Sequence, residues 1–286
     1  MTDLSAVQRR IIAVLSVGQV LGGISFGATV SLGAVLAAHL SGSDALSGLA
    51  TAAITLGTAL TAVPLAALAR RWGRRPALAT GMTVALVGVG LVIAAVAGHA
   101  FALLLTGFVL IGAGQAANLQ SRFAAADLAT DASRGRDLSI VVWTTTIGAV
   151  LGPNLVGPGE VVGAAVGMPP LTGAYVFTVV AQLAGIVLYL VALRPDPLLL
   201  AQRVVAAHDA AAARIACTDR PVAARYATVA IVGAHGVMVS IMAMTPVHLL
   251  HHGATLTIVG LTISLHIAGM YGLSPVFGLL ADRWGR

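Results

Sequence analysis

The stretch GLLADRWGR at residues 278–286 has a near copy, AALARRWGR, at residues 66–74. Each copy closes a long apolar run with arginines, as a membrane-spanning helix does where it leaves the bilayer. The two copies are six expected helices apart, and an even number gives both the same orientation. Such an internal duplication predicts two helical bundles related as parallel repeats.

The composition is that of a membrane protein. Of the 286 residues, 58% are hydrophobic and 9% are charged, and the mean hydropathy is +0.96. A soluble domain keeps about a quarter of its residues charged to cover its surface, so a soluble globular protein is excluded. The hydrophobic content excludes disorder, and apolar runs longer than about 20 residues exclude an outer-membrane barrel, whose strands are shorter. We therefore expect an all-α, polytopic membrane protein.

A helix needs about 20 apolar residues to cross the hydrocarbon of a bilayer. By this measure we expect eight spans, at residues 11–38, 45–69, 76–97, 101–128, 138–161, 171–193, 226–250 and 256–281. They divide the chain into an N-terminal six-helix bundle (1–194), a cytoplasmic connection (195–225) and the first two helices of a C-terminal bundle (226–286). The first apolar run is too long for a cleaved signal peptide, so we expect a retained helix.

The arginines define the topology. All 16 basic residues are arginine, and the formal net charge is +6. Apart from Arg122, every arginine precedes the first expected span or follows an even-numbered one. The positive-inside rule therefore predicts a multi-pass protein of the cytoplasmic membrane with its N-terminus in the cytoplasm. The lipid bilayer accounts for the basic excess, and we expect no nucleic-acid partner. The single cysteine, Cys217, excludes an intramolecular disulfide and a cysteine-based metal site.

The second copy resembles the loop motif of the major facilitator superfamily, in which Gly-x-Leu-Ala-Asp-Arg-x-Gly-Arg joins helices two and three and recurs between helices eight and nine. The matching residues are Gly278, Asp282, Arg283, Gly285 and Arg286 in the second copy and Arg71, Gly73 and Arg74 in the first. The resemblance implies two six-helix bundles that rock about a central site, with a conformational role for these residues. It also implies twelve helices, so the chain is expected to be a fragment or a truncated reading frame.

The first copy departs from this motif at two positions. Ala66 replaces the glycine and Arg70 replaces the acid, so the charge pairing that the resemblance implies for this loop lacks its usual carboxylate. Asp127 and Asp131, at the end of the expected fourth span, are the nearest candidate anions for the surplus arginines. The alternative is that these arginines only anchor the loop at the membrane surface.

The fifth expected span contains GAVLGPNLVGP at residues 148–158. A proline kinks a helix and glycines allow close packing, so this segment is expected to bend or to pack tightly. It resembles the Gly-Pro motif of superfamily antiporters, which implies a conformational role for Gly148, Gly152, Pro153 and Gly157. Those antiporters are mainly drug exporters, and a proton-coupled exporter of drugs or metabolites is therefore an alternative function. Val109 stands where the exporters carry an arginine.

A polar stripe lies on the expected fourth span, where Gln115, Asn118 and Arg122 follow one another at spacings of three and four. Residues at these spacings share one face of a helix. Arg122 is the only cation inside an expected span, so it should face a central cavity and find a partner there. That partner is either an organic anion as substrate or, in a purely structural role, an acid such as Asp127.

Methionines and histidines share faces on the last two spans: His235, Met238 and Met242 on the seventh and His266 and Met270 on the eighth. Thioether and imidazole donors suit Cu(I). The pattern resembles bacterial copper importers of the superfamily, which implies Met238, Met242, His266 and Met270 as ligands of transported Cu(I). Riboflavin importers belong to the same branch, so another small substrate and simple packing remain alternatives. We expect no resident cofactor.

These features together predict a secondary transporter of a small solute that works by alternating access. Copper import is the most specific version of this hypothesis. Three histidines at the far end of the seventh span, His248, His251 and His252, either bind a metal, sense pH or are simply solvated. A non-transporting membrane receptor or an inactive fragment is the alternative from another class. An enzyme is not expected, because the sequence contains no nucleophile with a base and no phosphate-binding loop.

Overall fold

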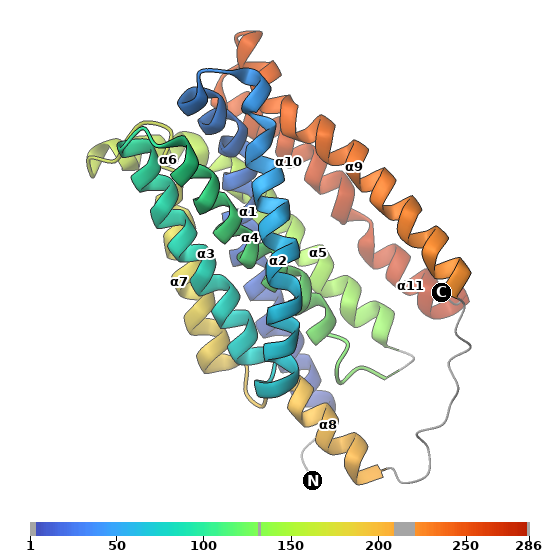
Figure 1. The fold of residues 1–286 in the computed structure, drawn as a ribbon. Coiled ribbons are helices and arrows are strands. Elements are labelled where there is room, and N and C mark those ends of the chain that lie inside the picture. Colours follow the sequence, from blue (N-terminus) through green and yellow to red (C-terminus); the bar gives the residue numbers. More distant parts are fainter. Residues whose placement is uncertain (1–3, 131–132, 209–220, 285–286) are drawn as a thin grey trace.

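A computed structural model describes residues 4–130, 133–208 and 221–284, and all the regular structure within them is helical. In chain order the elements are α1 (Leu4–Ser41), the short 3₁₀ helix η1 (Asp44–Leu46), α2 (Gly48–Trp72), α3 (Arg74–Ala97), α4 (Phe101–Ala124), α5 (Arg134–Asn154), α6 (Val156–Ala165), α7 (Tyr175–Ala192), α8 (Pro197–His208), α9 (Pro221–His251), α10 (Leu256–Gly272) and α11 (Ser274–Trp284). The long helices run roughly side by side (Figure 1). The predicted all-α class is confirmed.

The predicted spans correspond to these helices with two breaks. Within the described residues, seven helices are long and apolar enough to cross a membrane, and the bent pair α5 and α6 makes an eighth if it forms one span. The bend between α5 and α6 is 53° and falls beside Pro153, inside the predicted Gly-Pro segment. A second break, at Leu273, separates α10 from α11 and was not predicted. Helix α8, in the predicted polar connection, was also missed.

Small residues hold α5 against α1. A Cβ atom added to Gly148 would collide with the backbone carbonyl of Val20, and one added to Gly152 would lie 2.5 Å from the carbonyl oxygen of Ile24. The two backbones therefore touch where the glycines stand, as expected for helices that associate without a hydrophobic drive. Gly157 differs, because its added Cβ would meet only the hydroxyl of Thr257, at 3.8 Å.

A buried polar network ties α1, α4 and α5 together in the interior. The amide nitrogen of Gln19 donates to the carbonyl oxygen of Asn118 at 2.8 Å and to the hydroxyl of Ser121 at 2.7 Å. The hydroxyl of Thr145 donates to Gln19 Oε1 at 3.0 Å. Each polar group of this network is satisfied inside the protein, which is what a buried amide in a membrane protein requires.

Helix α9 packs on the rest of the molecule through its C-terminal half only. Ala243, Pro246 and Val247 are buried, whereas the residues of its N-terminal half, from Thr228 to Val237, are exposed. In the buried stretch, the Ser47 hydroxyl donates to the sulfur of Met244 at 3.4 Å. Helix α9 therefore meets α1 and α2 near the end of the molecule that carries no arginine (Figure 1).

Helix α10, in contrast, follows α5. The amide nitrogen of Asn154 donates to Ser264 Oγ at 2.8 Å, and Ser264 Oγ donates to the carbonyl oxygen of Val150 at 2.9 Å. A Cβ added to Gly260 would stand 2.7 Å from the carbonyl oxygen of Pro153. The carbonyl groups near the proline bend thus form part of the surface on which α10 rests.

Candidate functional site

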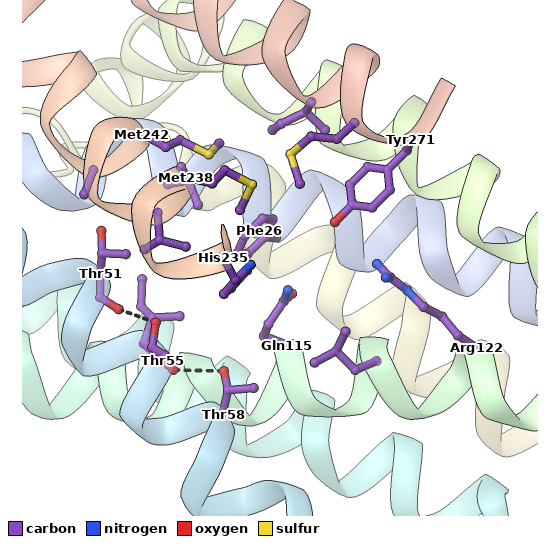
Figure 2. Close-up of a pocket in the computed structure, with 17 residues that line it drawn as sticks. Phe26, Thr51, Thr55, Thr58, Gln115, Arg122, His235, Met238, Met242 and Tyr271 are labelled. Carbon is purple, nitrogen blue, oxygen red and sulfur yellow. Dashed lines mark hydrogen bonds between the residues drawn. The ribbon is translucent and has the colours of Figure 1, made fainter. Parts of the chain in front are cut away.

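A cavity of about 350 Å³ lies between α1, α2 and α4 on one side and α9 and α10 on the other. Its walls are mainly apolar, with a few polar side chains that point inward (Figure 2). Small-molecule sites in proteins have this size and this mixture of apolar walls and few polar groups. The cavity is therefore the candidate site, and the predicted site residues are placed relative to it.

Helix α4 contributes two of its three predicted polar residues to the cavity. Gln115 and Arg122 line it, and they stand seven residues apart, which places them on one face two turns apart. Asn118 does not line it. That residue is buried against α1, where an added Cβ at Gly22 would lie 3.2 Å from Asn118 Oδ1. The polar stripe is thus shared between the cavity and the α1 interface.

Arg122 meets an aromatic ring across the cavity. Its guanidinium carbon lies 5.3 Å from the ring centroid of Tyr271, within the range of a cation–π interaction. Its Nε is buried and has no hydrogen-bond partner among the described residues. The alternative of an ion pair between Arg122 and Asp127 is not observed, because the Asp127 carboxylate is bound to Arg74.

The methionines of the last two helices also line the cavity. Met238 and Met242 enter it from α9 with His235 (Figure 2). Met270 lines it from α10. His266, the fourth predicted copper ligand, is exposed and is not among the lining residues, because Ile263 and Ile267 take the buried face of α10. Three thioethers and one imidazole therefore share the cavity. The described residues contain no group of three or more His, Cys, Asp or Glu that could hold a metal ion.

Several lining residues were missed from the sequence. Thr51, Thr55 and Thr58 line the cavity from α2, and Tyr271 lines it from α10. The threonine spacing of four and three inside an apolar span was the available signal. Two of these hydroxyls donate to their own helix, from Thr55 to the carbonyl oxygen of Thr51 at 2.8 Å and from Thr58 to that of Ile54 at 2.9 Å.

In the arginine loop after α2, Asp127 pairs with an arginine, although its partner is the motif residue Arg74 and not one of the surplus arginines. Arg74 binds Asp127 through two parallel contacts, Nε to Oδ2 at 2.8 Å and Nη2 to Oδ1 at 3.0 Å. The neighbouring backbone N–H of Arg75 donates to Asp196 Oδ2 at 2.8 Å, and the same carboxylate accepts from the N–H of Leu198 at the start of α8. Asp196 thus supplies a carboxylate to a loop in which Arg70 replaces the usual acid.

Gly73 explains why this loop can turn there. Its φ is +97°, a backbone conformation that residues other than glycine rarely adopt. A Cβ added at this position would also collide with the carboxylate of Asp196. Arg71 lies with its guanidinium carbon 5.8 Å from the Trp72 ring. In the second copy, Gly278 packs against Ser139 of α5. Asp131, Gly285 and Arg286 lie outside the described residues, as does the side chain of Asp282, and Arg283 is exposed.

Comparison with known proteins agrees with this architecture. The family model described as Major Facilitator Superfamily matches residues 15–286. Two similar proteins of Bacillus subtilis (strain 168) are the uncharacterized MFS-type transporters YdeG and YddS. YdeG is 39% identical over 98% of this chain and 66% of its own length, and YddS is 37% identical over 97% and 65%. The chain therefore spans slightly less than two thirds of these relatives.

A third relative, the riboflavin transporter RfnT of Brucella anthropi, is 31% identical over 100% of this chain and 70% of its own length. Among solved structures, the human organic anion transporter MFSD10 (TETRAN) has a similar fold, with a TM-score of 0.52 and 18% identity. The match covers 66% of this chain and 48% of that one. At this identity the likeness concerns the fold alone.

Proposed function

Because the chain belongs to the major facilitator superfamily, we propose that it is a secondary transporter that moves a small solute across the cytoplasmic membrane by alternating access. The observation that carries this proposal is the cavity of about 350 Å³ between α1, α2 and α4 on one side and α9 and α10 on the other. A site between two sets of helices opens to one side or the other when the sets tilt.

The proposed orientation follows the arginines. By the positive-inside rule the arginine-rich loops and the N-terminus are cytoplasmic. The contacts of α9 with α1 and α2 then lie on the outer side, and the exposed N-terminal half of α9 lies on the inner side. This arrangement corresponds to an inward-facing state. We propose residues 1–194 as the first bundle, 195–225 as the cytoplasmic connection and 226–286 as the beginning of the second bundle.

The residues proposed to bind the solute are those that line the cavity from α4, α9 and α10. Arg122 and Gln115 offer hydrogen bonds, and Met238, Met242 and Met270 offer apolar and polarizable contacts. Riboflavin is one solute to test, because the relative RfnT is named as a riboflavin transporter. The Gly148–Pro153 segment packs against α1 and bends beside α10, which supports a conformational role in import or export.

Cu(I) is the second candidate substrate. It is favoured by one observation, the three thioethers and one imidazole that line one cavity, since soft donors of this kind suit Cu(I). Arg122 lies in the same cavity and opposes a cation there. His266 is outside the lining set in this conformation, so its participation requires α10 to turn.

Uptake into proteoliposomes tests these candidates side by side. Purified chain is reconstituted, and accumulation of riboflavin and of Cu(I) is measured for wild type, Met242→Leu, His266→Ala and Arg122→Gln. Copper transport predicts that the first two variants lose copper uptake and that Arg122→Gln keeps it. Transport of an organic solute predicts the reverse. Met168→Leu, in the loop between α6 and α7, is the matched methionine control, and uptake of neither solute contradicts both candidates.

A further inference from the structure

The charges around the cavity are unequal. Within the described part of the chain, Arg122 is the one arginine that lines the cavity, and no aspartate or glutamate lines it. The remaining walls are apolar, sulfur-containing or neutral, with His235 as the other basic group. A cation surrounded by such walls and by a low dielectric is costly unless an anion accompanies it. The cavity therefore has the electrostatic character of an anion site.

The guanidinium of Arg122 has donors to spare. Its interaction with Tyr271 is of the cation–π type, at 5.3 Å, and this uses no N–H group. Among the described residues no hydrogen bond to Arg122 occurs, and its Nε is buried. Planar guanidinium groups bind carboxylates through two parallel N–H bonds. Tyr271 can thus hold Arg122 in place while the N–H groups take a carboxylate.

Gln115 supplies a second fixed point. It lines the cavity, and its Oε1 is buried without a hydrogen bond from a described residue, so the amide nitrogen is the end that a bound molecule can reach. Gln115 precedes Arg122 by seven residues on the same face of α4, a separation of about 10 Å at 1.5 Å per residue. The amide N–H groups can donate to an acceptor oxygen of a bound molecule. The wall between the two points is apolar and includes Leu119 of α4 and Phe26 of α1.

We infer that the cavity takes an organic monoanion whose carboxylate binds Arg122. The same molecule carries a hydrogen-bond acceptor for Gln115 about 10 Å away, on an apolar body. The substrate class rests on the proposed transport function, whereas the binding preference does not depend on it. A volume of about 350 Å³ fits a molecule of one or two rings.

Three matched probes test this inference by isothermal titration calorimetry on the purified 286-residue chain in detergent. They are 4-(4-hydroxyphenyl)butanoate, its methyl ester without the anion, and 4-phenylbutanoate without the phenolic oxygen. Wild type should bind the first about 10-fold or more tightly than either of the others, the range expected for one charged or buried hydrogen bond.

Two variants should each remove one preference and keep the other. Arg122→Gln should lose the preference for the acid over the ester and keep the preference for the phenol. Gln115→Leu should lose the preference for the phenol and keep that for the acid. The preference that each variant keeps shows that the variant is folded. Arg203→Gln, at an exposed position of α8, removes an equal charge and should change neither preference.

The inference is overturned if wild type binds acid and ester equally, if Arg122→Gln keeps the preference for the acid, or if folded wild type binds none of the probes. These results differ from a failure of the proposed function. Anion-selective binding without any uptake in proteoliposomes contradicts transport and leaves the binding preference standing. Uptake of a neutral solute with no anion preference supports transport and refutes the inference.

Discussion

His251 Nε2 lies 3.3 Å from Asp44 Oδ2 and connects the end of α9 to the turn between α1 and α2. The pair is ionic when the imidazole is protonated. It stands beside the contact of Ser47 with Met244, at the end of the molecule that carries no arginine. In the proposed orientation these contacts close the outer side of the cavity, so they stabilise the inward-facing state over an outward-facing one.

Asp44→Asn should therefore increase the outward-facing population. Both side chains are more than half exposed, and exposed pairs contribute about 0.2–1 kcal/mol, so the expected change is up to about 5-fold. Spin labels at positions 46 and 254, in a Cys217→Ser background, measure the distance between these two turns. His252→Gln is the control, because its ring contacts His248 and not Asp44. An unchanged distance distribution in Asp44→Asn refutes this role.

Loss of the Arg74–Asp127 ion pair should lower the stability of the protein to thermal unfolding more than loss of another arginine of the same loop. The side chains of the pair are 14% and 11% exposed, and Asp127→Asn leaves the arginine without its counter-charge. We expect a loss of about 1–3 kcal/mol, visible as a lower midpoint of thermal unfolding in detergent. Arg71→Gln, at the exposed position over Trp72, should change the midpoint little. Equal midpoints for the two variants contradict the prediction.

Replacement by alanine should lower the stability of the protein at one glycine of the Gly-Pro segment and leave it unchanged at another. Gly148→Ala forces a methyl group into the carbonyl of Val20, so α1 and α5 must separate, at a cost of about 1–3 kcal/mol. Gly157→Ala finds ordinary contact distance and should be tolerated. Thermal unfolding of the two variants in one detergent measures the difference. A stable Gly148→Ala protein shows that the helices do not pack as described.

Much of the fold is readable from the sequence because span length and hydropathy are local properties. The eight apolar runs and the bend near Pro153 needed no tertiary information. The break at Leu273 and helix α8 depend on packing and capping in segments without a strong pattern. For the same reason Asp196 was missed, since its role requires the loop at Gly73 to lie beside the start of α8.

The site was predicted less completely than the fold. Arg122, Gln115 and the three methionines that line the cavity could be selected from the sequence, because polar or sulfur-containing residues at helical spacing stand out in an apolar span. The rotation of each helix was not available from one sequence. Asn118 turns toward α1, and His266 turns away from the cavity because two isoleucines of α10 take its buried face. Tyr271 lines the cavity but was not predicted from the sequence.

Accessibility of a cysteine at position 55 tests alternating access most directly, because Thr55 lines the cavity from α2. In a Cys217→Ser background, Thr55→Cys is treated with a membrane-impermeant maleimide in right-side-out and in inside-out vesicles. We expect fast labelling from the cytoplasmic side, and slower labelling from the outside that Asp44→Asn accelerates. Labelling from one side only in both proteins, or equally fast labelling from both sides, contradicts a cavity that opens alternately.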